Sequence, residues 1–388
     1  MAEIVLLVLW LRMAACAVLG LAFRRGRCRA SARGAARPGV AVVIPAFNEA
    51  CNIGGTLASL RSQVPPPAEI VVVDDGSTDA TAVLARRSLT GFGPGRVIVL
   101  PANLGKAEAL NAGIRATHCE LVLTLDADTR LAPGALDAAL ETLEARRADA
   151  VAFHVDVDNA ATWLGGLQRQ EYLAALNFER AGQDVVGAIS ILPGAATLFR
   201  RAVLLDHPFS ARTRTEDADL SLGLGRRGLR LALADGAVAA TVVPASGLAL
   251  VRQRVRWIAG HLQCCAVHAR GPESAGRLFG LLTFPNFVMA TLSLPCASVA
   301  MAAIWATGPT AFLGFTWGQA ALASGVLIYV QRAGAWLLGG RRRASFACLV
   351  LEPWVTSVVA TVSFAAALGW LVRARGARRV SRHPRRAG

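Results

Sequence analysis

Residues 121–131 read LVLTLDADTRL, an apolar run with one Thr that ends in two carboxylates, Asp126 and Asp128, one residue apart. The apolar run predicts a buried strand. The acids after it have two interpretations. They can form a turn, in which Asp accepts hydrogen bonds from the nearby backbone, or they can hold a metal ion. This stretch alone leaves both interpretations open.

Three more runs of strand length precede it, and helix-length stretches separate them. The predicted strands are VAVVIP (40–45), EIVVVD (69–74), RVIVL (96–100) and ELVLTLD (120–126), and the helices are expected to begin near residues 51, 78, 105 and 133. Short, wholly apolar strands that alternate with helices are typical of a parallel sheet covered on both faces. The predicted fold class is therefore α/β with a mostly parallel sheet.

The composition indicates a membrane protein, because 54% of the 388 residues are hydrophobic. The net charge is +15, and arginine-rich runs at 24–37, 341–343 and 373–388 border apolar segments. This pattern is typical of cytoplasmic loops that face anionic lipid. Basic residues are not interleaved with aromatic ones, so we predict no nucleic-acid partner. Eight cysteines without a CxxC pair and six histidines without HExxH spacing predict neither disulfides nor zinc.

The chain divides into five predicted parts. Residues 1–23 form an N-terminal transmembrane anchor, in which Arg12 would cost about 2.5–3.5 kcal/mol unless it snorkels or pairs. A cytoplasmic catalytic domain (38–245) is followed by amphipathic interfacial helices (246–277), a C-terminal transmembrane region (278–373) and a basic tail (374–388). We expect a multi-pass protein of the cell (inner) membrane.

The C-terminal region contains three hydrophobic stretches, at about 278–306, 309–331 and 344–372. Three spans would place the basic tail outside the cell, against the positive-inside rule. Either one stretch is re-entrant or interfacial, or the tail is an exception, and the sequence leaves both open.

The ends of the four predicted strands share a chemistry. They are followed by PAFNE (45–49), DDGSTD (74–79), NLGKAEALNAG (103–113) and DADT (126–129), and the third of these holds Lys106, the single lysine among 41 basic residues. Ligands of α/β sheets bind at the carboxyl ends of the strands. Carboxylates suit Mg²⁺ or Mn²⁺ that is shared with a substrate phosphate. Neither a P-loop nor a dinucleotide fingerprint is present, so the pattern favours an enzyme that uses a nucleotide diphosphate-sugar.

Four motifs in order resemble the membrane-embedded, inverting glycosyltransferases of family 2, which include cellulose, chitin, hyaluronan and poly-N-acetylglucosamine synthases. They are DDGS (74–77), DAD (126–128), TED (215–217) and QRVRW (253–257), which matches Q-x-x-R-W. The resemblance covers about residues 38–270. It implies a GT-A type nucleotide-sugar-binding domain combined with transmembrane helices.

The resemblance also implies roles for the donor-binding residues. Glu49 and Asp75, with Asp74, would hold the uridine and its ribose. Asp128, with Asp126 behind it, would ligate Mg²⁺ or Mn²⁺ at the diphosphate. Lys106 would lie beside the nucleotide, although it could also be an ordinary surface lysine.

Asp217 would be the general base, in a motif that it shares with Thr215 and Glu216. The same residues also predict a helix start with Thr215 as its N-cap, and both interpretations can hold. In QRVRW, the spacing places Gln253, Arg256 and Trp257 on one helix face.

Arg256 would pair with the pyrophosphate and Trp257 would stack on a sugar, although Arg and Trp are equally common at a bilayer interface. The segment LPGAATLFRR (192–201) resembles the acceptor side, where Gly194 would let the backbone approach the sugar.

The predicted activity is therefore transfer from a UDP-sugar to a growing β-linked polysaccharide. The alternative is transfer of one sugar to a membrane lipid, as in ceramide glucosyltransferases. A non-catalytic scaffold that keeps the fold is a third possibility. The chain departs from the polysaccharide synthases in having one N-terminal span, a short C-terminal membrane part and no obvious lysine-bearing gating segment. The sequence does not define the sugar, the acceptor or the linkage.

Overall fold

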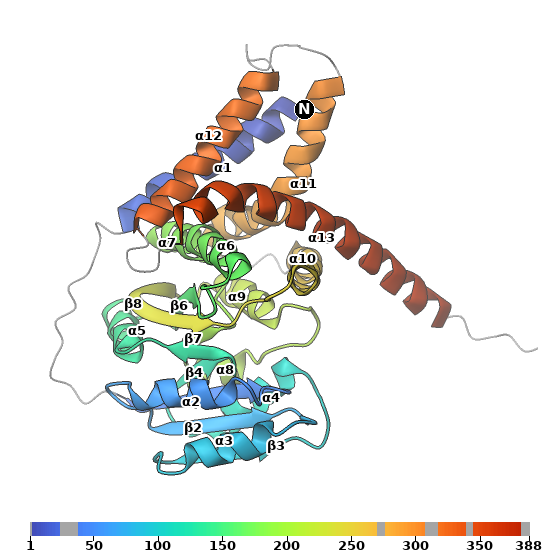
Figure 1. The fold of residues 1–388 in the computed structure, drawn as a ribbon. Helices are drawn as coiled ribbons and strands as arrows, with labels where there is room; N and C mark the ends of the chain where they lie inside the picture. The colour runs from blue at the N-terminus through green and yellow to red at the C-terminus, as the bar shows by residue number, and fades with distance from the viewer. Residues whose placement is uncertain (1, 24–37, 270–275, 307–316, 339–343, 382–388) are drawn as a thin grey trace, which may run out of the picture.

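The structure is a computed structural model that describes residues 2–23, 38–269, 276–306, 317–338 and 344–381. An eight-stranded sheet in the order β3-β2-β1-β4-β7-β6-β8-β5 forms the lower body in Figure 1, and helices from both ends of the chain lie above it. This is an α/β fold with an added helical layer.

Half of the sheet agrees with the sequence prediction. Strands β1 (Val40–Ala46), β2 (Glu69–Asp74), β3 (Gly95–Val99) and β4 (Leu121–Leu125) are parallel to their neighbours in the order β3-β2-β1-β4. The helices that follow them also begin within three residues of the expected positions: α2 (Ile53–Arg61), α3 (Thr81–Leu89), α4 (Lys106–Ala116) and α5 (Ala135–Ala145).

The other half of the sheet is mixed and was not predicted as strands. Its members are β5 (Thr129–Leu131), β6 (Ala150–Val157), β7 (Ala196–Arg200) and β8 (Leu231–Thr241). Strand β7 lies between β4 and β6 and is antiparallel to both. Polar and small residues interrupt the apolar pattern of β6 and β8, for example His154 and Gly236, so periodicity alone does not identify these strands.

Two apolar cores cover the two faces of the sheet. Alternate strand residues such as Val42 and Val72 pack with α2, α3 and α5 on one face. Their neighbours Val43 and Val73 pack with α4, α7 (Glu179–Val185) and α9 (Glu216–Arg226) on the other. The inner parallel strands β1, β2 and β4 are thus buried on both sides, as is typical of parallel strands.

Except for the short α8, which lies beside β7 and α4, the remaining helices lie above the sheet, toward the upper end of the molecule (Figure 1). They are α1 (Ala2–Phe23), α6 (Trp163–Glu171), η1 (Tyr172–Phe178), α8 (Arg201–Asp206), α10 (Gly247–Ala269), η2 (Phe279–Thr283), α11 (Phe284–Ala306), α12 (Trp317–Leu338) and α13 (Phe346–Ser381). The three predicted C-terminal hydrophobic stretches thus correspond to α11, α12 and α13. Helix α13 continues through the first residues of the predicted basic tail. The arginine-rich runs 24–37 and 341–343 and the end of the tail, 382–388, lie outside the described residues.

Two of the described helices have the length and apolar composition needed to cross a membrane, over Ile4–Phe23 and Phe346–Arg373. A shorter apolar helical segment, Phe279–Ser293, consists of η2 and the first part of α11.

Arg12, in the middle of α1, is paired. Its guanidinium lies 2.8 Å from a carboxylate oxygen of Glu179 and donates to Asn286 Oδ1 at 3.0 Å. Gln331 donates to the other carboxylate oxygen of Glu179 at 2.9 Å. These contacts join α1, α11 and α12 to α7, a helix that packs on the sheet. Of the two ways to offset the cost of Arg12, the structure uses pairing.

Candidate active site

A cleft of about 300 Å³ lies at the carboxyl ends of β1, β2 and β4. Each predicted strand end contributes to its wall, and α4 supplies its first residue, Lys106. The side chains that line the cleft include Glu49, Asp75, Lys106, Asp126 and Asp128. Four segments that are far apart in the sequence therefore meet at one place, as their strand positions predict.

Lys106 links two of the predicted motifs. Its Nζ atom lies 2.6 Å from Asp126 Oδ1 and 3.4 Å from Glu216 Oε1. Burial lowers the pKa of Lys106, but the charges of Asp126, Glu216 and Asp217 outweigh this effect and raise its pKa. The lysine is therefore a charged member of the cleft, between the DAD and TED segments, and the surface-lysine interpretation is wrong.

The two acids of DAD have different surroundings. Burial raises the pKa of Asp126 to about 6, although Lys106 acts in the opposite direction. Burial, followed by repulsion from Glu49, also raises the pKa of Asp128. Asp128 Oδ1 accepts hydrogen bonds from the hydroxyls of Thr129 and Thr241, both at 3.2 Å. Asp126 thus has a cationic partner, whereas the contacts of Asp128 are with neutral hydroxyls.

This donor set suits a divalent cation that is shared with a diphosphate. Within the described ranges, no three His, Cys, Asp or Glu side chains are placed to hold a metal by themselves. Mg²⁺ and Mn²⁺ commonly use one or two carboxylates and complete their shell with phosphate and water. Burial makes ionisation of Asp126 and Asp128 unfavourable, and a nearby cation would relieve this.

Asp217, in the first turn of α9, faces the segment that resembles the acceptor side. Its Oδ2 atom accepts a hydrogen bond from the Gly194 amide at 3.1 Å. A Cβ atom on Gly194 would lie 3.0 Å from this oxygen and 3.2 Å from Lys106 Nζ. Gly194, which was expected to lie close to a sugar, lies next to Asp217 and Lys106 in the structure and has no side chain that would crowd them.

Burial, together with repulsion from Glu216, raises the pKa of Asp217 to about 6, and Lys106 opposes this. If Asp217 is the base, it must be ionised in the free enzyme. We expect kcat/KM to be constant above about pH 6 and to fall about tenfold per pH unit below it. A pH–rate profile between 4.5 and 8 checks this. A rate that stays constant down to pH 4.5 would contradict the assignment, because an ordinary Asp titrates near 3.9.

Thr215 occupies the position before α9, as predicted, but its side chain does not cap the helix. Its hydroxyl instead lies 3.7 Å from the Cys264 sulfur on α10. A Cβ atom on Gly260 would lie 2.5 Å from Thr215 Oγ1. The close approach of α10 has therefore replaced the expected cap with an interhelical contact.

Gly260→Ala should separate α10 from the TED segment. Because the added methyl group meets both the side chain and the backbone of Thr215, we expect a loss of about 1–3 kcal/mol in the free energy of unfolding and lower transfer activity. Gly223→Ala is the matched control, since the nearest atom to its Cβ lies 3.6 Å away. Thermal unfolding of both variants tests this. Equal melting temperatures would contradict the predicted contact.

The QRVRW segment lies on α10, with its residues in different environments. Trp257 is half-buried, with its ring centroid 6.5 Å from that of Tyr172 and 4.2 Å from the guanidinium carbon of Arg254. Gln253 accepts a hydrogen bond from Arg254 at 2.8 Å. Arg256 is exposed. Burial raises the pKa of Glu216, whereas the charge of Lys106 and, to a smaller extent, that of Arg256 lower it, and the net pKa is lowered. Arg256 therefore acts electrostatically on the TED motif.

The first two acidic motifs have structural partners as well. The Asp75 carboxylate accepts hydrogen bonds from the amides of Leu104 (2.7 Å) and Gly105 (2.9 Å), so it fixes the loop before Lys106. Asp74 is 2% exposed and accepts from the Ser77 amide. It is therefore buried next to Asp75 and is not among the residues that line the cleft. Glu49 accepts from Asn52 at 2.7 Å and lines the cleft.

Two arginines near this site were not predicted. Arg254 is buried and lies 2.7 Å from a carboxylate oxygen of Glu171. Arg180 is 5% exposed and donates from Nε to the Ile191 carbonyl at 3.0 Å, while its Nη1 atom has no hydrogen-bond partner in the described part of the chain. Burial lowers the pKa of Arg180 to about 10, and the charge of Asp217 opposes this. With 40 arginines in the chain, composition gives no signal for either.

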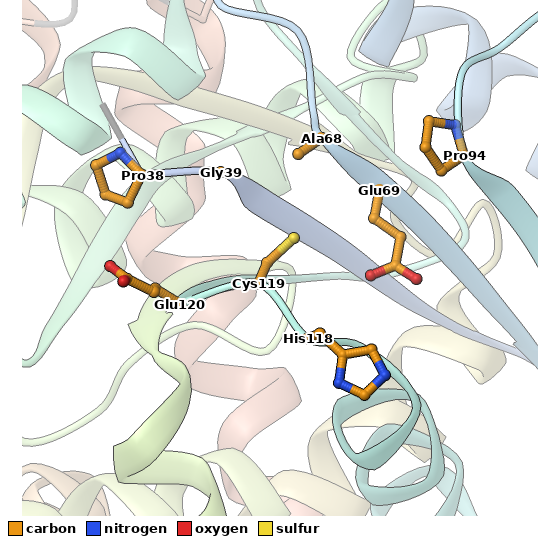
Figure 2. A pocket seen from close by; sticks show the side chains of 8 residues that line it. All are labelled: Pro38, Gly39, Ala68, Glu69, Pro94, His118, Cys119 and Glu120. Atoms are coloured by element: carbon orange, nitrogen blue, oxygen red, sulfur yellow. The ribbon is translucent and has the colours of Figure 1, made fainter. Parts of the chain in front are cut away.

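A second depression, of about 690 Å³, lies at the opposite edge of the sheet, near the start of β1 and β2. Its polar side chains include Glu69, His118 and Glu120. Figure 2 shows that these side chains point in different directions and do not converge. Glu69 is paired with Arg96 and accepts a hydrogen bond from Thr117. The smaller cleft, at the carboxyl ends of the strands, is therefore the better candidate for the active site.

The family sequence model described as "Glycosyl transferase family 2" matches residues 41–207. Residues 41–207 therefore carry a glycosyltransferase family 2 domain, which confirms the resemblance seen in the motifs. The fold is GT-A-like. A mannosyltransferase from Pyrobaculum calidifontis, solved with GDP-Man and Mn²⁺, has a TM-score of 0.65 and 22% identity, with 95% of this chain and 99% of that chain covered.

Two curated relatives carry more specific names. An N-acetylglucosaminyltransferase of Mesorhizobium japonicum is 35% identical over 233 residues, covering 57% of this chain and 55% of the relative. A poly-beta-1,6-N-acetyl-D-glucosamine synthase of Staphylococcus epidermidis is 30% identical over 224 residues, covering 57% of this chain and 54% of the relative. The chain thus spans about half the length of the curated relatives that it matches.

Proposed function

We propose that this chain is a membrane-bound inverting glycosyltransferase that moves a sugar from a UDP-sugar to a growing β-linked polysaccharide, with Mg²⁺ or Mn²⁺ as cofactor. The observation that carries the proposal is the meeting of Lys106 with Asp126 and Glu216 at the carboxyl edge of the sheet, next to Asp217. The names of the two curated relatives make UDP-N-acetylglucosamine the first donor to test.

In the proposed complex, Glu49 and Asp75 face the uridine and ribose, and Asp74 supports them from below. Lys106 and Arg256 bind the pyrophosphate. Trp257 provides an apolar surface for a sugar ring, and Gln253 orients the side chains of α10 around that sugar. Asp128, with Asp126 behind it, would hold the metal, and Asp126 would also stay paired with Lys106. When bound, the ion neutralises the charge that develops on the UDP leaving group.

Asp217 is the proposed general base. The acceptor hydroxyl oxygen forms a bond to the anomeric carbon, the bond from that carbon to the UDP oxygen breaks, and the hydroxyl proton passes to the Asp217 carboxylate. The Gly194 amide orients this carboxylate, and Thr215 and Glu216 place it at the start of α9. A single displacement converts an α-linked donor into a β-linked product.

We also propose that the catalytic block, 38–245, is cytoplasmic and attached to the cell (inner) membrane. Support comes from the two apolar helices and from the arginine-rich runs beside apolar segments in the sequence. Lipids are then direct partners of the chain.

Purified full-length protein incubated with a panel of labelled UDP-sugars and Mg²⁺ or Mn²⁺ tests the proposal. We expect metal-dependent release of UDP and a ladder of saccharides when the products are sized. A single organic-soluble product would instead indicate transfer of one sugar to a lipid. No turnover of any UDP-sugar would contradict the enzyme proposal.

A further inference from the structure

We propose that α13 lies flat against the lipid surface instead of crossing the bilayer, with its outer face bound to anionic lipid. This inference rests on the membrane attachment in the proposed function. By length and composition alone, α13 could cross a membrane. Its contacts indicate another placement.

One face of α13 packs on the catalytic block and on α10, from the start of α13 to the end of its apolar part. Near its start, the Cys348 sulfur would lie 2.9 Å from a Cβ atom on Gly166 of α6. In its middle, the Ser363 hydroxyl is 3.5 Å from the Val251 carbonyl of α10. Near the end of its apolar part, the ring centroid of Trp370 lies 3.9 Å from the guanidinium carbon of Arg214, just before the TED motif.

These contacts extend from residue 348 to residue 370, which are about 33 Å apart along the helix. The hydrocarbon core of a bilayer is about 30 Å thick. If α13 crossed it, α6, α10 and Arg214 would have to accompany the helix through the lipid. They cannot do so, because α6 and Arg214 belong to the block that contains the polar cleft and the sheet, and α10 is packed against α9 of that block. Helix α13 therefore cannot cross the bilayer while it keeps these contacts.

The opposite face of α13 is apolar and exposed. Its stripe consists of residues at helical spacing whose side chains are 39–68% exposed: Phe346, Val350, Trp354, Val358 and Val362. In the sequence, Arg341–Arg343 precede this stripe and the arginine-rich run 373–379 follows it. An apolar stripe between two groups of arginines fits an interface with anionic headgroups.

The arrangement of the other apolar helices agrees with this placement. In Figure 1, α13 runs across the lower ends of α1, α11 and α12, and these three helices extend upward from it. If α11 and α12 cross the bilayer as a pair and α13 stays at the surface, the arginine-rich tail is on the catalytic side. This result satisfies the positive-inside rule and answers the question that the three hydrophobic stretches leave open.

A depth measurement tests the inference. Nitroxide labels are placed singly at positions 346, 350, 354, 358 and 362 of the full-length chain, with its accessible native cysteines replaced by Ser, in vesicles of phosphatidylglycerol and phosphatidylethanolamine. Depth is read from relaxation by oxygen and by a water-soluble nickel complex. We expect all five positions at a similar shallow depth. A crossing helix would spread them over about 24 Å along the bilayer normal, which would overturn the inference.

Labels at 322, 326 and 330 on α12 are the matched control, because these exposed apolar positions have the same spacing. We expect their depth to change progressively. If α12 crosses and α13 also crosses, only this inference fails. If neither helix contacts lipid, the membrane attachment fails with it. Transferase activity is not part of the readout, so failure of the proposed reaction would leave the depth profile unchanged.

Discussion

Asp217→Asn is expected to lower the rate of sugar transfer by about 10²–10⁴-fold, the usual contribution of a general base. Asn has nearly the shape of Asp, and its amide oxygen can still accept the hydrogen bond from Gly194 that holds Asp217 in place. The substitution therefore removes the proton acceptor and keeps the contact with Gly194, while its amide nitrogen replaces the oxygen that accepts from the Ala218 amide. UDP affinity should stay nearly the same, since Asp217 is proposed to act on the acceptor.

The measurement is kcat for transfer together with UDP affinity by calorimetry on the same preparation. Asp206→Asn is the control, because Asp206 is exposed at the end of α8, away from the cleft. An equal loss of transfer and UDP affinity would contradict the base assignment and would instead make Asp217 a donor-binding residue.

Asp128→Ala is the second substitution with a large expected effect. We expect metal-dependent UDP binding to weaken by at least about 100-fold, since loss of even an indirect metal partner costs 10–100-fold. Asp126 cannot fully substitute for it, because Lys106 already lies 2.6 Å from its Oδ1 atom. Binding of UDP in the presence of EDTA should be weak in both proteins.

Titration of UDP with and without Mn²⁺ checks this, with Asp206→Ala as control. Asp128→Asn separates charge from packing, because it keeps the shape that the hydroxyls of Thr129 and Thr241 contact. If Asp128→Ala left the effect of Mn²⁺ on UDP affinity unchanged, the metal would have to bind elsewhere.

The sequence predicted the parallel half of the fold well, because β1, β2 and β4 are buried on both faces and consist almost entirely of apolar residues. Strand β3, at the edge, is partly exposed but contains Val and Ile. The mixed half depends on tertiary pairing. Strand β7 takes its place between β4 and β6 through antiparallel pairing, which local pattern does not encode.

The sequence predicted the part of the candidate site that is formed by residues at the ends of the strands. Glu49, Asp75, Asp126 and Asp128 follow strands whose order places them together, and Lys106 begins the helix after β3. The close contact of Lys106 with Glu216 could not be predicted, because it depends on where α9 packs. The same is true of Arg180, whose position beside Asp217 depends on the docking of α7.

The hydrogen bonds of Asp75 could not be predicted from the sequence either. A motif gives the residue type but not the hydrogen bonds, and here both carboxylate oxygens accept from the backbone before Lys106. Asp75 therefore shapes the cleft in addition to lining it.

A structure of the full-length chain with UDP and Mn²⁺ tests the central claim most directly. The account predicts Mn²⁺ bound to Asp128 and the diphosphate, with the uridine between Glu49 and Asp75. Nucleotide bound instead in the depression beside Glu69 and His118, at the opposite edge of the sheet, would contradict it.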